Sequence, residues 1–132
     1  VGIDPQIHKV MSVGRAIRNL RQYLQPTPLD GSCEGEPPIG NILTNPESIC
    51  IEPSGEVDVC WHLPIGNAKK KPLSLIISEY DWRKNPTIKI LVKEGPMGLL
   101  KSAEKHFDRF RRDKYVSKCH LCIEIRKTLN TS

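Results

Sequence analysis

The sequence predicts an α+β fold, with a small β-hairpin, several helices and long irregular loops. Eleven prolines and nine glycines among the 132 residues indicate the irregular segments. Only 5% of the residues are aromatic and 38% are hydrophobic, so the core should be small for this length. Five cysteines are an odd set, which favours metal binding over a fully disulfide-bonded framework. We therefore expect one metal-stapled domain.

Composition also narrows the location and the partners. The net charge of +5, from 20 basic and 15 acidic residues, is compatible with a nucleic-acid or acidic partner and equally with an ordinary solvated surface. No apolar run approaches the roughly 20 residues of a membrane span, and no secretory leader is visible. These features predict a cytoplasmic protein without a membrane partner. The chain begins at Val1 rather than Met, which indicates a piece of a longer protein.

The first predicted element is a helix that begins at Asp4 and Pro5, because Asp is a good N-cap and Pro suits the first helical position. Apolar residues recur at helical spacing as far as Leu24, and Pro26 ends the helix. Residues 25–46 then form a predicted loop rich in Pro, Gly and Asp. A loop of this length is usually functional or mobile.

A β-hairpin follows, with apolar and polar residues alternating on both arms and the turn Pro53-Ser54-Gly55 between them. A three-residue loop places Gly55 where the backbone needs a positive φ. It also pairs Ile51 with Val57, which collects the apolar residues on one face. A two-residue loop would mix the two faces, so the hydrophobic pattern selects the three-residue loop.

This register fixes the relative positions of the two thiols of the hairpin. Cys50 falls opposite Asp58, and Cys60 becomes its diagonal neighbour on the same face. Diagonal Cα atoms are roughly 7 Å apart, whereas a disulfide prefers about 5.5–6 Å. The hairpin therefore disfavours a disulfide between its own arms.

The rest of the chain predicts further helices. A short one is expected at residues 73–77, and residues 86–94 and 97–110 form two helices broken at Gly95-Pro96. A terminal helix follows the last cysteines. The second of the broken pair should bury a stripe of Leu100, Ala103, Phe107 and Phe110.

Cys119 and Cys122 form a CxxC pair at the start of that terminal helix. Two thiols at this spacing can face one metal, and the helix N-terminus should lower their pKa. The pair alone fits half a zinc site, half an iron–sulfur site or a redox pair, although no thioredoxin-like βαβ pattern surrounds it. A four-thiol site needs two more cysteines, from the hairpin or from the loop before it.

The hairpin and the CxxC resemble the C-terminal auxiliary-cluster domain, of the SPASM or shorter twitch type, of radical S-adenosylmethionine enzymes. The likeness covers about residues 30–126, and its most specific part is Gly-x4-Cys followed by Gly-Asn. The residues that carry it are Ile49–Ile51, Pro53–Val57, Cys60, Gly66-Asn67, Cys119 and Cys122. The resemblance implies one 4Fe–4S cluster held by four thiols. Its implied ligands are Cys33, Cys60, Cys119 and Cys122, with Cys50 as the rival to Cys33.

The resemblance also implies a domain organisation. Residues 1–28 would be a linker helix from a missing N-terminal barrel domain, and residues 29–132 would be the auxiliary domain. The barrel domain and a peptide or small-molecule substrate would be its partners, and S-adenosylmethionine would bind only in the barrel. The cluster would serve electron transfer or substrate docking.

The sequence departs from the family pattern in three ways. Five cysteines allow one cluster rather than two, as in the shorter form. No cysteine lies at the usual distance before the turn glycine, since Cys50 is too close and Cys33 too far. The CxxxCxxC loop that holds the catalytic cluster is missing, so the chain is not a complete enzyme of this family.

Two other functions fit the same residues. One is a structural zinc domain that uses the same thiols, because zinc and iron both accept four thiolates. The other is an RNA-binding module of a modification enzyme, with Lys69–Lys71 and Arg109–Lys114 as its surface, although such runs are more often solvated. In the ordinary interpretation Cys50, His62, His120, Trp61 and Trp82 are structural or surface residues. We expect the metal to dock residues 119–126 onto residues 48–60.

Overall fold

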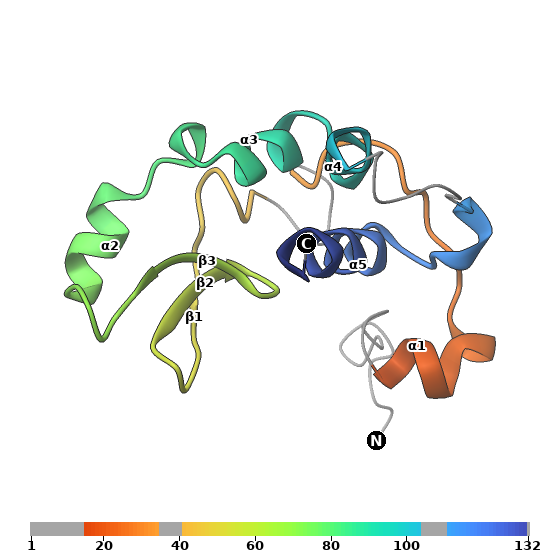
Figure 1. Ribbon diagram of the computed structural model, residues 1–132, viewed down its shortest axis with the longest axis horizontal. Helices are drawn as coiled ribbons and strands as arrows, with labels where there is room; N and C mark the ends of the chain where they lie inside the picture. The colour runs from red at the N-terminus through yellow and green to blue at the C-terminus, as the bar shows by residue number, and fades with distance from the viewer. Residues whose placement is uncertain (1–14, 35–40, 104–110, 132) are drawn as a thin grey trace, which may run out of the picture.

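The computed structural model describes residues 15–34, 41–103 and 111–131. Over these residues the predicted α+β class is confirmed, with five α-helices and one three-stranded antiparallel sheet (Figure 1). No helix in this part of the chain is long and apolar enough to cross a membrane. The strands are β1 (Cys50–Ile51), β2 (Glu56–Cys60) and β3 (Leu63–Asn67). The helices are α1 (Arg15–Leu20), α2 (Leu73–Glu79), α3 (Pro86–Lys93), α4 (Pro96–Ser102) and α5 (Lys118–Thr131).

The hairpin has the predicted register, with Ile51 opposite Val57 and Cys50 opposite Asp58. Gly55 adopts φ 92°, as the three-residue loop requires. The alternation of apolar residues and one turn glycine were therefore sufficient to predict this part of the sheet. The prediction of a one-sided apolar face is only partly met, because Ile51 is half exposed.

The sequence did not predict the third strand. β3 follows β2 after the two-residue turn Trp61-His62 and places β2 in the centre of the sheet. Pro64 and Gly66 weaken the strand pattern, but Pro64 lies in an edge strand, where a missing N–H is tolerated. Two irregularities in the pairing flank Asp58. As a result three successive residues of β2, Val57, Asp58 and Val59, are all buried.

The helical predictions agree in position and differ in length. The helices predicted at residues 73–77 and 86–94 are present as α2 and α3, and α4 begins after the predicted break at Gly95. The helix predicted over 97–110 ends at Ser102, and the predicted core residues Phe107 and Phe110 lie outside the described residues. The start of the first helix, at Asp4, lies outside them as well.

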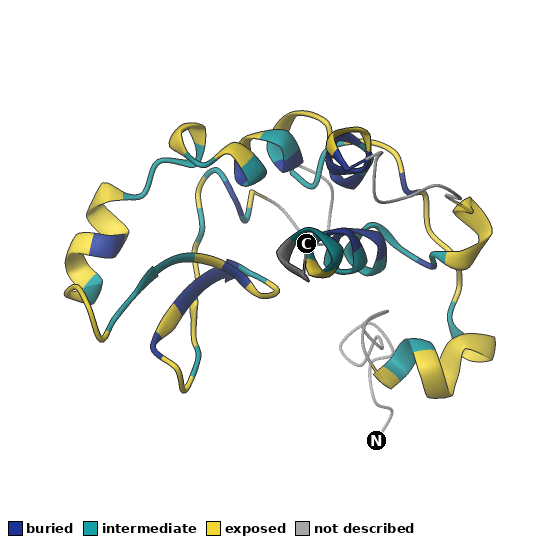
Figure 2. Cartoon of the chain, viewed as in Figure 1, coloured by how far each residue is buried: buried dark blue, intermediate teal, exposed yellow. Residues whose placement is uncertain are grey.

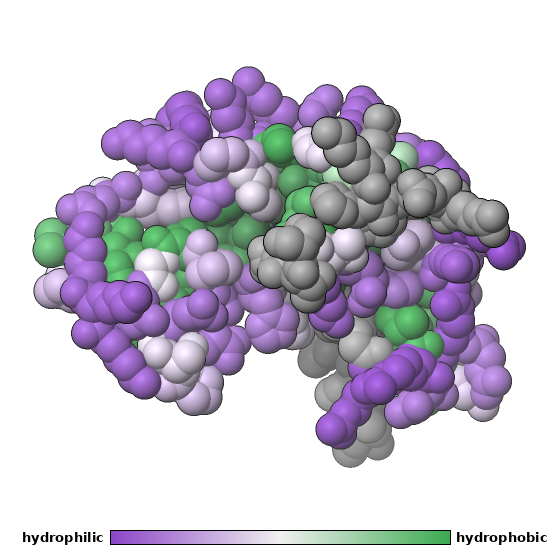
Figure 3. Space-filling model, viewed as in Figure 1, coloured by the Kyte–Doolittle hydropathy of each residue, from purple (hydrophilic) through white to green (hydrophobic). Residues whose placement is uncertain are grey.

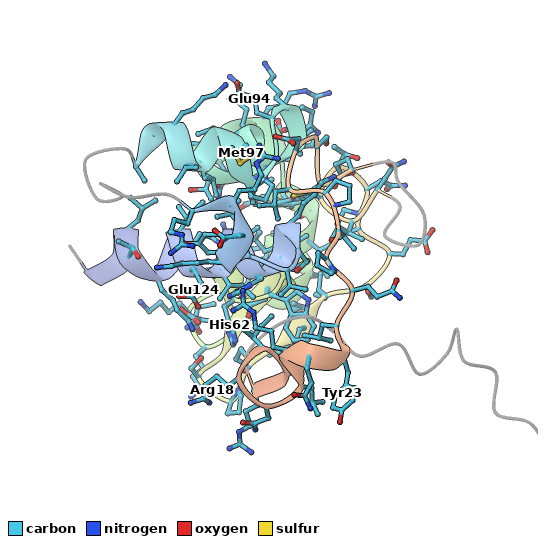
Figure 4. All side chains as sticks on the ribbon, turned by 90° about the vertical axis from the view of Figure 1, so that its right-hand side faces the viewer. Arg18, Tyr23, His62, Glu94, Met97 and Glu124 are labelled. Carbon is cyan, nitrogen blue, oxygen red and sulfur yellow. The ribbon has the colours of Figure 1, made fainter. Side chains whose placement is uncertain are left out.

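The core lies where the sheet, α5 and the α3–α4 pair meet (Figure 2). Figure 3 shows the same region as an apolar band framed by hydrophilic side chains. The described parts of the predicted loop contain neither helix nor strand, yet they add Leu29 and Leu43 to the core. By contrast α1 buries no residue. Figure 4 shows α1, with Arg18, below the main body, while Met97 of α4 lies above α5. The core residues of the sheet and helices include Val59, Leu63, Ile88, Leu91, Leu99, Leu121 and Ile125.

Candidate metal centre

Four of the five cysteines line a single small cavity of about 50 Å³. Apolar side chains supply most of the remaining wall, including Ile42, Leu43, Leu63, Leu91 and Ile123. Because three separate parts of the fold converge here, the site forms only in the folded chain. The four residues are the implied ligands Cys33, Cys60, Cys119 and Cys122.

The loop that carries Cys33 lies against the end of α3. The Cys33 amide donates to the Leu91 carbonyl at 3.2 Å, and the Ser32 hydroxyl donates to the Val92 carbonyl at 2.6 Å. Immediately before them, Gly31 touches Gly95 so closely that a Cβ on Gly95 would lie 1.9 Å from the Gly31 carbonyl oxygen. The loop is thus held by α3 and by the α3–α4 connection.

Cys60 is the last residue of β2, next to the two-residue turn into β3. The turn is tight enough that His62 adopts a left-handed φ of 48°. The position of Cys60 therefore depends on the pairing of β2 with β3, the strand that sequence reasoning missed. Trp61 also lines the cavity, although the residue is 44% exposed.

Cys119 and Cys122 lie in the first turns of α5, as predicted. Ser117 precedes the helix; its hydroxyl accepts from the His120 amide at 3.1 Å and its carbonyl from the Leu121 amide at 3.1 Å. The Lys118 ammonium donates to the Ser32 carbonyl at 3.1 Å. That contact joins the start of α5 to the loop of Cys33.

Arg126 is a site residue that sequence reasoning missed. It lies one helical turn after Cys122 and donates from Nε to the Cys122 sulfur at 3.3 Å. Its two terminal nitrogens donate to the carbonyls of Trp61, at 2.5 Å, and His62, at 2.6 Å. One side chain therefore connects a thiol of α5 with the turn next to Cys60. The spacing of four residues after Cys122 was the signal that could have identified it.

Burial dominates the electrostatics of the thiols. Burial, followed by the neighbouring thiols Cys122, Cys119 and Cys60, raises the pKa of Cys33 to about 12. Burial also raises the pKa of Cys60 and of Cys119, although Arg126 acts in the opposite direction on both. The expectation that the helix N-terminus lowers the pKa of Cys119 is therefore wrong for the metal-free chain. Thiolates in this cavity need a bound cation to compensate their charge.

The spacing of the thiols differs from that of a single-ion site. Four thiolates at 2.3 Å from one zinc ion lie about 3.8 Å apart. Among the described residues, three or more potential ligand atoms lie within 4.8 Å of one another only in a different group, formed by Glu52, Asp58 and His62. No three of the thiols, all of which lie in the described part of the chain, come this close together. The four sulfurs are thus spread more widely than the ligand shell of a single zinc ion.

The fifth cysteine lies elsewhere. Cys50 is exposed on β1 and lines a different, open groove together with Asp58 and His62. Neither His62 nor His120 lines the thiol cavity. His120 accepts a hydrogen bond from the Val116 amide at 3.2 Å, and burial lowers its pKa. Of the two rivals for the remaining ligand, Cys33 is the one that lies with the other three.

The chain matches no family model, no curated protein and no solved structure. The residues behind the family resemblance have local structural roles. Gly55 takes the positive φ of the hairpin and its carbonyl accepts from the Ala68 amide at 2.8 Å. A Cβ on Gly66 would lie 2.9 Å from the Ile76 side chain. Because glycine has no Cβ, α2 can pack closely against β3 at this point. The Asn67 side chain accepts from the Lys69 amide at 2.9 Å and turns the chain toward α2.

Proposed function

We propose that this chain is the auxiliary domain of a radical S-adenosylmethionine protein and binds one 4Fe–4S cluster. Its ligands would be Cys33, Cys60, Cys119 and Cys122. The observation that carries the proposal is the convergence of these four thiols, from three separate elements, on one apolar cavity that excludes the fifth. Four thiolates are the usual ligand set of such a cluster.

The spread of the four sulfurs favours a cluster over a single zinc ion. The thiols do not gather within the distance that one tetrahedral ion requires, whereas a cluster of four irons separates its ligands by its own size. A structural zinc domain is the alternative proposal. It would require the four sulfurs to move toward one another on binding.

The protein residues around the cavity suit an electron-transfer site. When bound, the cluster would supply one-electron chemistry. The apolar wall restricts water, and Arg126 brings a hydrogen-bond donor and a positive charge to the Cys122 sulfur. Donors to cluster sulfurs and nearby positive charge raise the reduction potential of such sites. Arg126 would therefore tune the potential, while the thiols bind.

Its partners would be an N-terminal barrel domain, which binds S-adenosylmethionine, and a peptide or small-molecule substrate. A nucleic-acid partner is the weaker alternative, because two arginines of the basic run are paired within the chain. Arg112 forms two hydrogen bonds with Asp30, and Arg111 is paired with Asp113. These pairs reduce the charge that is free to meet phosphates.

The test is anaerobic reconstitution with iron and sulfide. We expect about four irons per chain and a broad absorption near 400 nm. Substitution of Cys33, Cys60, Cys119 or Cys122 by Ala should abolish stable binding, and Cys50→Ala, the matched control, should retain it. Stoichiometric zinc without iron uptake would overturn the proposal in favour of the zinc domain.

A further inference from the structure

A second cluster of ligand-type side chains lies beside the central strand β2, in the groove that Cys50 also lines. Glu52, Asp58 and His62 each place one potential ligand atom within 4.8 Å of the others. They come from the first arm of the hairpin, the central strand and the β2–β3 turn. All three line an open groove of about 710 Å³, which shares Cys60 and Trp61 with the wall of the thiol cavity but does not include Cys33, Cys119 or Cys122.

Asp58 is the unusual member. Its exposed fraction is 2%, and its Oδ1 has no hydrogen-bond partner in the described structure. A buried carboxylate oxygen without a partner is costly, and native proteins normally satisfy such groups. The irregular pairing on both sides of Asp58 turns this strand so that the carboxylate is buried rather than solvated.

The neighbours of Asp58 leave its Oδ1 without a partner, although its carboxyl group shares a hydrogen bond with Glu52. Glu52 adds a second carboxylate. The distance from His62 Nδ1 to Glu52 Oε1 is 3.9 Å, which is too long for a hydrogen bond. A small cation placed between the three side chains would satisfy the orphan oxygen and both carboxylates at once. The same cation could take the free nitrogen of a neutral imidazole.

We infer that Glu52, Asp58 and His62 bind a divalent metal ion, independently of the four-thiol centre. Two carboxylates and one imidazole form a mixed oxygen and nitrogen set, which suits first-row ions such as Mn²⁺ or Zn²⁺. The wide groove leaves coordination positions open to water or to a ligand. The two sites share a structural connection, because the His62 carbonyl accepts from Arg126, which also contacts Cys122.

Mn²⁺ is the appropriate probe, because carboxylates bind it well and soft thiolates are selected by other metals. The test measures Mn²⁺ binding to the full chain, both as purified and after iron–sulfur reconstitution, by the loss of the free-ion electron paramagnetic resonance signal. We expect one Mn²⁺ per chain. Glu52→Gln and His62→Gln should each weaken binding by at least about tenfold, which is the lower end of what even outer-shell changes cost.

The matched control is Glu56→Gln, which removes the same charge from an exposed position on β2 outside the groove. It should leave Mn²⁺ affinity within about twofold. Asp58→Asn should abolish binding, and because Asp58 is buried, circular dichroism must show that the variant is folded. Glu52 and His62 are more exposed, so their variants test the site even if Asp58→Asn fails to fold.

Three results would overturn the inference. They are the absence of Mn²⁺ binding, equal affinity in Glu52→Gln and wild type, and loss of binding in Glu56→Gln to the same extent as in the site variants. In the first of these cases, binding of a lysine-containing peptide to the groove would indicate that the carboxylates serve a cationic side chain instead. None of these results depends on whether the thiols hold iron or zinc.

Discussion

Substitution of Gly95 tests whether the α3–α4 connection holds the loop of Cys33 in place. Gly95 has φ 71° and ψ −165°, a region that essentially only glycine occupies. Adopting it with a side chain costs about 1–3 kcal/mol. A Cβ would also lie 1.9 Å from the Gly31 carbonyl oxygen, which is backbone and cannot rotate away. Relief of such an overpacked contact typically costs about another 1–3 kcal/mol.

Gly95→Ala should therefore lower the free energy of unfolding by about 2–6 kcal/mol, a large share of the ~5–15 kcal/mol of a typical domain. Gly31→Ala is the matched control. Gly31 also has a positive φ, 94°, but the nearest atom to its Cβ would be the Lys118 ammonium at 3.5 Å, an ordinary contact. It should cost only the conformational penalty of about 1–2 kcal/mol.

Urea unfolding followed by circular dichroism measures both changes on metal-free chains, and iron content after reconstitution measures the effect on the site. We expect Gly95→Ala to lose more stability than Gly31→Ala and to retain less iron, since the displaced loop carries Cys33. Equal losses in the two variants would show that the contact with Gly31 is relieved without cost. The proposed seating of the loop would then be incorrect.

Three further predictions follow from individual contacts. Arg126→Leu should make the reduction potential of the reconstituted cluster more negative in voltammetry, because it removes the hydrogen bond to Cys122. Lys127→Leu, which removes the same charge from an exposed neighbour, should leave the potential unchanged. Equal shifts in the two variants would refute a role for the hydrogen bond. Tyr80→Phe should lower the free energy of unfolding in urea by about 1 kcal/mol, because the Tyr80 hydroxyl donates to the Leu43 carbonyl at 2.5 Å. The control Tyr23→Phe, at a residue that is 74% exposed, should leave it unchanged. With S-adenosylmethionine and a reductant, the chain alone should form no 5′-deoxyadenosine above background, and formation would show that the missing CxxxCxxC loop is not required.

The predictable parts of the fold were those encoded locally. Alternation and one glycine fix the β1–β2 register, and Pro and Gly at residues 95–96 separate α3 from α4. β3 was missed because Pro64 and Gly66 disguise a strand that is stabilised by pairing with β2 and by packing against α2. The burial of Asp58 was equally invisible, since it follows from irregular pairing with that third strand.

The sequence predicted that cysteines form the site, but it identified only some of the individual residues. Sequence spacing identified the CxxC and Cys60 but left Cys33 and Cys50 as rivals, because both depart from the family distance to Gly55. Their separation is a tertiary effect: the approach of Gly31 to Gly95 brings Cys33 to the cavity, while the hairpin register leaves Cys50 exposed. The role of Arg126 depends on the turn at residues 61–62 meeting α5, which no local pattern encodes.

The packing of α5 also changes what a metal staple would do. Leu121 and Ile125 are fully buried in the core, so apolar contacts already dock α5 against the sheet and α4. The loop of Cys33 and the β2–β3 turn have less apolar support. Hydrogen bonds to Leu91 and Val92 and from Lys118 hold the loop, and hydrogen bonds from Arg126 hold the turn. Removal of the metal should therefore reduce hydrogen-exchange protection at residues 31–34 and 60–63 first, with α5 protected longer. Simultaneous loss across α5 would show that the metal, rather than the apolar core, holds this helix in place.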